Sequence, residues 1–130
     1  GQSTTIISKV PKHQCWYLPS IGQWWDIFEN LGEAKGLTAL KDNETTSSNI
    51  AISLSGESVF ENLNTCLKAA SSSVDEFESS KNYWSSSEHN RNNKGLVYAH
   101  SVSLTATSLT TTGATKTSNS NRRVRCVLSF

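Results

Sequence analysis

The sequence predicts an α+β domain in which two helices pack on a twisted antiparallel sheet. Two segments with apolar residues at helical spacing, 21–31 and 57–70, come before the long strands. From residue 82 onward the apolar residues alternate with small or polar ones, which is the period of a half-buried strand. Helices followed by strands with short connections favour α+β over a parallel βαβ sheet.

The length of the chain fits one compact domain. The protein has 130 residues and a mass of 14.2 kDa, and single domains usually run to ~100–150 residues. Residues 1–14 are polar apart from Ile6-Ile7, so we expect an N-terminal segment or linker there. A single domain is expected over 15–130, and its first element is a short strand at 16–18.

The helix expected over 21–31 has the clearest local signal. Ser20 is a good N-cap, and Gln23 follows at the capping-box spacing. One wide apolar stripe contains Ile21, Trp24, Trp25, Phe28 and Leu31. We therefore expect Trp24 to lie in the core; an aromatic platform for stacking a sugar, at Trp24 and Trp25, is the alternative.

The remaining elements follow in order. A loop over 33–49 leads to a short strand at 50–54, and Val59, Leu63 and Cys66 mark the apolar side of the second helix. Strands are then expected at 83–88, 96–104 and 105–112, and a last regular strand at 123–130. In that last strand Val124, Cys126, Leu128 and Phe130 would face one way and Arg123, Arg125 and Val127 the other.

Composition and charge exclude several classes of protein. The chain contains 22 Ser, 13 Thr and 11 Asn, and no apolar run approaches the ~20 residues that span a bilayer. The net charge of +1 argues against a whole-surface nucleic-acid binder. The chain starts without Met, which we interpret as a processed or engineered start, so the lack of a signal peptide says nothing about export. The second half is the more basic: either the two halves simply meet in one fold, or the second half forms a basic face for acidic glycans.

No reactive constellation is evident, so we expect no enzyme activity, no cofactor and no metal site. Cys15, Cys66 and Cys126 lack zinc-ligand spacing. Each has apolar neighbours, which predicts three small core residues. The pairing stays open; if one bridge exists, Cys15–Cys126 is our choice, because it would tie the first segment to the last strand. His100 falls on the apolar side of its strand and is expected to be a core histidine.

Two features are candidates for ligand binding. The loop Glu88–Gly95 places donors and acceptors beside Trp84, and its candidate contacts are Glu88, His89, Arg91 and Asn92. A solvated hairpin loop is the alternative. Arg123 and Arg125 would project together, an arrangement that suits sulfate or carboxylate groups. The alternative is an Arg pair satisfied by buried carboxylates or backbone carbonyls.

These segments, in their order, resemble the C-terminal domain family of the Legionella collagen-like adhesin, also seen as the Fibrobacter major paralogous domain. The resemblance covers about residue 15 to the C-terminus and rests on Trp16-Tyr17-Leu18-Pro19-Ser20, Gly22-Gln23-Trp24, Glu61-Asn62-Leu63-Asn64, Tyr83-Trp84-Ser85-Ser86-Ser87-Glu88 and Arg123-Val124-Arg125-Cys126-Val127. Gln23 departs from the Glu expected in many members, and the linker between the helices is long.

The resemblance implies a C-type-lectin-like fold, close to that of the sulfatase-modifying enzymes. It implies an extracellular attachment module at the end of a larger bacterial surface protein or fimbria. Trp16, Ser20, Trp84 and Arg125 would then be fold-defining residues. The local motif of the enzymes' cysteine pair and the lectin calcium triplets are both missing, so neither site is carried over.

From these observations we expect a non-catalytic bacterial cell-surface adhesion or binding module. Its partner would be a glycan or an extracellular protein, it would be extracellular or attached to the outer membrane, and other domains of a larger surface protein are further partners. The first alternative is a structural module of a fimbrial or envelope assembly that docks by strand addition. An oxygen-dependent cysteine oxidase is the third possibility, and it would need two thiols that are readily labelled in the folded chain.

Overall fold

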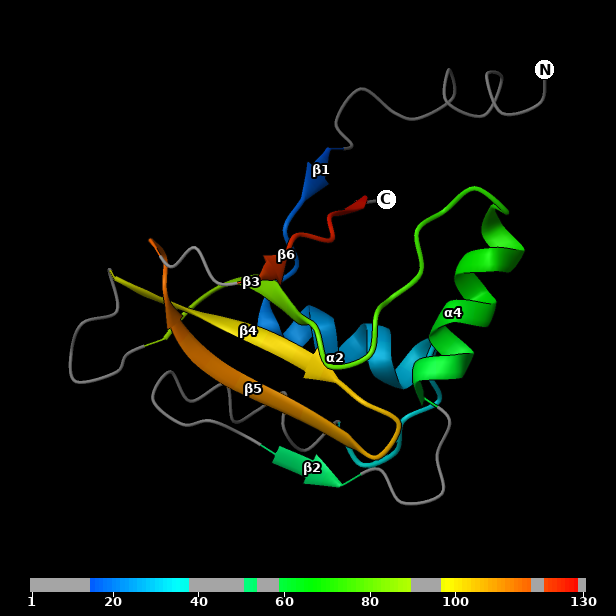
Figure 1. Cartoon of the computed structure of the whole chain (residues 1–130), viewed down its shortest axis with the longest axis horizontal. Coiled ribbons are helices and arrows are strands. Elements are labelled where there is room, and N and C mark those ends of the chain that lie inside the picture. Colours follow the sequence, from blue (N-terminus) through cyan, green and yellow to red (C-terminus); the bar gives the residue numbers. More distant parts are fainter. Residues whose placement is uncertain (1–14, 38–50, 54–58, 90–96, 118–120, 129–130) are drawn as a thin grey trace.

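The computed structural model describes residues 15–37, 51–53, 59–89, 97–117 and 121–128. They form an α+β fold in which two helices accompany a curled, mixed sheet (Figure 1). The elements are β1 (Trp16–Tyr17), α2 (Ile21–Asn30), β2 (Ala51–Ser53), α4 (Val59–Ala70), β3 (Asn82–Glu88), β4 (Tyr98–Leu104), β5 (Ser108–Thr115), β6 (Arg122–Arg123) and β7 (Val127–Leu128).

Helix α2 begins with the predicted capping box. The Ser20 hydroxyl accepts a hydrogen bond from the Gln23 backbone N–H at 3.2 Å, and the Gln23 side-chain oxygen accepts one from the Ser20 N–H at 2.9 Å. The predicted apolar stripe is confirmed from Ile21 to Phe28, whereas Leu31, at the C-cap, is 46% exposed. The helix lies across one side of the sheet (Figure 1).

Helix α4 is joined to α2 through polar side chains as well as apolar ones. Val59 and Leu63 are buried, and the Asn62 amide donates to the carbonyl oxygen of Gly32 at 3.1 Å. Cys66, predicted to be core, is exposed, so that prediction was wrong. The start predicted for this helix, residues 57–58, lies outside the described residues.

The larger sheet has the strand order β2-β5-β4-β3-β6. The pairs β2–β5, β5–β4 and β4–β3 are antiparallel, as predicted, but β6 runs parallel to β3, with Tyr83 opposite Arg123. The prediction of a purely antiparallel sheet was therefore wrong at this edge. β6 lies beside the start of β3, where Asn82 is opposite Arg122, and this pairing sets the parallel direction.

The regular strand predicted over 123–130 is broken. The chain leaves the larger sheet after β6, and residues 124–126 belong to no strand. It then pairs again as β7, antiparallel to β1, with Trp16 opposite Leu128. Val124 is consequently 63% exposed instead of lying on a buried face.

The register of the β1–β7 ladder also explains why Cys15 and Cys126 are not bridged. All three cysteines are exposed, and Cys126 carries a free thiol, so both the core placement and the Cys15–Cys126 bridge were wrong. Cys15 lies beyond one end of the β1–β7 ladder and Cys126 beyond the other. Three strand residues separate these ends by about 10 Å, more than the ~7 Å between Cα atoms that a disulfide can join. The backbone pairing of β1 with β7 joins the first and last segments instead of a disulfide.

An aromatic cluster forms the core between α2 and the sheet. The Trp24 ring stacks on Phe28 with centroids 5.5 Å apart, and it meets the rings of Phe77 and Tyr83 at 6.0 and 6.1 Å. Trp24 is fully buried, so its predicted structural role is confirmed, and the aromatic-platform alternative is wrong for it. Trp16 is 70% exposed and adds nothing to this core. No helix among the described residues is both long and apolar enough to span a membrane.

Candidate functional site

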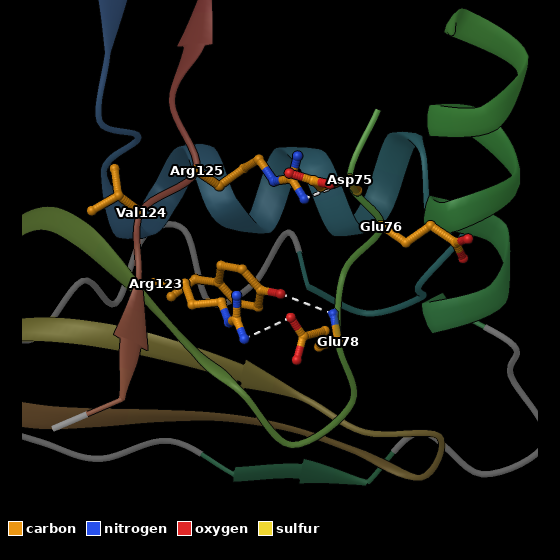
Figure 2. A pocket seen from close by; sticks show the side chains of 7 residues that line it. Asp75, Glu76, Glu78, Arg123, Val124 and Arg125 are labelled. Carbon is orange, nitrogen blue, oxygen red and sulfur yellow. Dashed lines mark hydrogen bonds and ion pairs between the residues drawn. The ribbon is translucent and has the colours of Figure 1, made fainter. Parts of the chain in front are cut away.

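A polar pocket of about 580 Å³ lies between β6 and the segment that precedes β3 (Figure 2). One side comes from residues 75–78, which connect α4 to β3, and the other from residues 123–125. The lining side chains are Asp75, Glu76, Glu78, Tyr83, Arg123, Val124 and Arg125. We call this cavity the polar pocket.

The acidic side of the polar pocket is fixed by Asn64 on α4. The Asn64 side-chain oxygen accepts from the Phe77 N–H at 2.8 Å, and its amide donates to the Phe77 carbonyl oxygen at 3.1 Å. Both bonds are buried, so they satisfy the backbone of a segment that has no ladder partner. The Tyr83 hydroxyl also accepts from the Glu78 N–H at 2.9 Å. These three bonds orient the short irregular segment between α4 and β3.

The basic side projects from the C-terminal segment toward the acidic side (Figure 2). An Arg123 guanidinium nitrogen lies 2.7 Å from a Glu78 carboxylate oxygen, and both side chains are about half exposed. Arg125 donates to the backbone carbonyl of Asp75 at 2.7 Å, and its guanidinium carbon lies 4.8 Å from the Phe77 ring centroid. The structure thus shows the satisfied Arg pair, with an exposed carboxylate in place of a buried one.

The charges of the polar pocket do not make it basic. Its lining has three carboxylates and two guanidiniums, and 2 − 3 leaves a formal charge of −1. Glu76 is also paired with Lys68, at 2.9 Å. Both guanidiniums already have partners and share the cavity with carboxylates, so sulfate binding by this pair stays a prediction.

Among the described residues, Glu88 and Arg123 of the predicted contact surface do not lie together. Glu88 stands at the far end of β3 from Tyr83, which pairs with Arg123. Five strand residues put about 16 Å between these positions. Glu88 is exposed and pairs with Lys116 at 2.7 Å, while Arg91 and Asn92 lie outside the described residues.

His89, predicted as a ligand contact, is a buried residue instead. It is 2% exposed, and its ring centroid lies 4.5 Å from that of His100. His100 is buried, as predicted. Burial, and secondly the neighbouring His89, lower the pKa of His100 from 6.5 to about 4. His100 is therefore neutral at pH 7, and both imidazoles lie in the interior rather than on a surface for ligands.

Sequence reasoning missed the acidic half of the pocket. The signal was present in Val74-Asp75-Glu76-Phe77-Glu78, which packs three carboxylates around one aromatic residue. What the sequence did not reveal is that Asn64 would hold this segment opposite Arg123. Asn64 was noticed only as part of a family-like motif.

Trp84 makes one backbone contact with α2 and one side-chain contact with β6. The indole N–H of Trp24 donates to the Trp84 carbonyl oxygen at 3.2 Å. The guanidinium carbon of Arg122 lies 5.1 Å from the Trp84 ring centroid. The contact with α2 uses a backbone carbonyl that any residue offers, so a structural role for the Trp84 side chain stays a prediction.

The exposed thiols of Cys66 and Cys126 line a second cavity, an apolar groove of about 330 Å³ beside α2 and α4. A cysteine-dependent oxidase would need a group there that takes the thiol proton. No histidine and no carboxylate is among the described residues that line this groove. Within the described ranges, no group of three or more His, Cys, Asp or Glu side chains is arranged to hold a metal ion.

The chain was compared with protein-family models, curated proteins and solved structures. No protein-family model, no curated protein and no solved structure matches the chain. The resemblance to the adhesin domain family therefore stays a prediction.

Proposed function

We propose that the protein is a non-catalytic adhesion module of a bacterial cell surface, and that it binds a hydroxyl-rich glycan in the polar pocket. We further propose that it belongs to the family of the Legionella collagen-like adhesin C-terminal domain and has a C-type-lectin-like fold. One observation carries the functional proposal: fixed hydrogen-bond donors and fixed acceptors line the same open cavity.

The chemistry of sugar hydroxyls fits that lining. A guanidinium only donates and a carboxylate only accepts, whereas each hydroxyl group does both. Hydrogen bonds with one charged member are about twice as strong as neutral ones. A vicinal pair of hydroxyls can therefore accept from Arg123 and donate to Glu78 at once. A sulfated glycan would meet three carboxylates, so a neutral glycan fits better.

A role as a structural module that docks by strand addition has less support. Such docking uses a run of main-chain hydrogen bonds along an exposed edge. In the described part of the larger sheet, the outer strands β2 and β6 have three and two residues. An edge this short offers few bonds to an incoming strand, so we favour the polar pocket as the contact site.

A glycan array with matched variants tests the proposal. Glu78→Gln removes the carboxylate that pairs with Arg123 and keeps the shape of the side chain. Glu88→Gln is the control, because it removes an equally exposed carboxylate from an ion pair of the same 2.7 Å length. We expect Glu78→Gln and Arg123→Gln to weaken retention of the neutral glycans at least about ten-fold, the effect of losing one or two charged hydrogen bonds, and Glu88→Gln to leave it unchanged.

Two results would contradict the proposal. One is equal retention by wild type, Glu78→Gln and Arg123→Gln, with native circular dichroism for all three. The other is release of new reducing ends from a retained glycan, which would show that the module is catalytic. Preferential retention on heparin that is lost in Arg123→Ala/Arg125→Ala would return the assignment to a sulfated ligand. Capture of an outer-membrane protein without any glycan retention would favour the structural module.

A further inference from the structure

An apolar groove opens beside the polar pocket, on the other side of Arg125. It lies where α2, α4 and the start of β7 meet, and Trp24, Leu31, Leu63 and Leu67 form much of its lining. Arg125 lines both cavities, and Phe77, on which its guanidinium lies, faces the groove. One stacked pair of side chains therefore separates a charged cavity from an apolar one.

We infer that the groove binds the apolar group of an amphiphilic glycan, a short alkyl or acyl chain attached to the sugar whose hydroxyls occupy the polar pocket. This inference rests on the proposed function, since one ligand would fill both cavities. The combined volume of the two cavities falls within the range usual for small-molecule sites, roughly 300–1,000 Å³.

The groove favours an alkyl chain because its lining is apolar and only partly covered. Leu31 is a large apolar side chain that remains 46% exposed at the groove, and Ile27 and Leu67 are only partly buried. Covering such surface is favourable, and binding should tighten by up to about four-fold for each methylene buried.

A peptide fits the groove less well than an alkyl chain. An extended peptide needs partners for its main-chain N–H and C=O groups. Among the described lining residues, Arg125 is the charged member, and its guanidinium already donates to Asp75. The Leu31 carbonyl oxygen accepts from the Cys66 thiol at 3.6 Å. An alkyl chain requires none of these bonds.

The cysteines provide a direct readout of occupancy. Cys66 and Cys126 both line the groove and are exposed, whereas Cys15 is exposed but is not among its lining residues. A chain in the groove should shield the first two thiols from a small alkylating reagent and leave Cys15 reactive. Peptide mass mapping reports the three positions separately in one sample.

The experiment measures N-ethylmaleimide labelling of the folded chain with methyl, butyl, hexyl and octyl β-glucosides, each below its micelle concentration. We expect slower labelling of Cys66 and Cys126 with butyl to octyl glucoside, at concentrations that fall as the chain lengthens, and no change at Cys15. Methyl glucoside should give no shielding. Equal shielding by methyl and octyl glucoside, or none by either, would overturn the inference.

Two neighbouring positions on α4 provide a matched pair of variants. Ala70 lines the groove and Ala69 does not, and both are exposed at the end of the helix. Ala70→Trp should fill the groove and abolish shielding by octyl glucoside, while Ala69→Trp should keep it. Unchanged shielding in Ala70→Trp, with a melting temperature like that of Ala69→Trp, would also overturn the inference.

A sugar-free probe separates this inference from the proposed function. If 1-octanol shields the two thiols as well as octyl glucoside does, the sugar contributes nothing and the proposed glycan site is contradicted, although the groove still takes an apolar chain. If glycan retention depends on Glu78 but no alkyl chain shields the thiols, the proposed function stands and this inference fails.

Discussion

At Gly113 on β5, a side chain would meet the buried ring of His89. A Cβ atom there would lie 2.6 Å from two carbons of that ring. The His89 ring is buried and Gly113 is paired in the sheet, so we expect Gly113→Ala to cost about 1–3 kcal/mol of unfolding free energy, the usual penalty of overpacking. Urea denaturation measures it. A double-mutant cycle with His89→Ala should show that the cost falls when the ring is absent; an equal cost in both backgrounds would contradict the contact.

His100 makes the stability depend on pH. Its folded pKa of about 4 lies below the 6.5 of the unfolded chain, so between these values the unfolded state binds more protons. Its contribution is complete above pH 6.5 and is lost as the pH falls toward 4. A fall from 6.5 to about 4 is worth at most about 3 kcal/mol, and solvent screening reduces this value.

Denaturation at pH 7.5 and pH 5 tests this prediction. We expect wild type to lose stability over that interval and His100→Phe to lose clearly less, because the buried titrating group is gone. The same loss in both proteins would assign the pH dependence to other groups.

Single residues were predictable where local chemistry decides their role. Ser20 and Trp24 follow from capping and periodicity, which depend only on nearby positions. His89, Trp16 and the cysteines were misplaced, because their burial depends on which distant strand covers them. Trp16 is apolar enough for a core, but its strand pairs with β7 in a two-stranded sheet, where Trp16 remains 70% exposed.

The capping box at the start of α2 should make a measurable contribution to stability. Ser20→Ala removes the acceptor for the Gln23 N–H and should cost about 1 kcal/mol. Ser20→Thr keeps the hydroxyl and should cost less. Urea midpoints compare the two; equal losses would show that the hydroxyl is not the relevant group.

The segment between α4 and β3 should depend on Asn64. Asn64→Leu leaves a buried N–H and a buried carbonyl of Phe77 without partners, which we expect to cost about 2–4 kcal/mol. Asn62→Leu removes one partly buried bond and is the control, at about 1 kcal/mol. Glycan retention should fall in Asn64→Leu and not in Asn62→Leu, under conditions where both are folded. The reverse order would contradict the positioning role.

Elements were predicted well where the hydrophobic period is sustained. Both helices and strands β3 and β4 lie where the pattern places them, whereas β5 runs over Ser108–Thr115 rather than 105–112. The last strand was predicted wrongly. Apolar and polar residues alternate over 123–128 as they would in one strand, although the chain changes from one sheet to the other within this segment. Periodicity fixes which residues are extended but not which neighbour they pair with.

Over the whole molecule, the two sheets should open independently. The β1–β7 sheet has two residues in each strand, whereas β4 and β5 pair over seven positions in the larger sheet. We expect amide exchange in β1 and β7 to occur by local opening, nearly independent of urea, and exchange in β4 and β5 to require global unfolding. Native-state hydrogen exchange by NMR distinguishes these regimes. A shared urea dependence would show that the molecule opens as one unit.

The order of helices and strands was enough to predict the α+β class, but not the site. The polar pocket joins residues 75–78 to residues 123–125, and that meeting depends on the parallel edge strand β6. No local sequence pattern predicts that a strand of two residues will pair in parallel with β3. Each half of the site was visible in the sequence as a charge cluster, and only the topology places the two halves opposite each other.

The pairing of β1 with β7 has a consequence for how such a module can be built into a larger chain. In an antiparallel ladder the polypeptide enters and leaves at the same end, about 5 Å apart. A host protein could therefore carry residues 15–128 as an insertion in a tight surface turn, because the gap to be bridged is no wider than the turn itself. Both tethers would then anchor one corner of the domain.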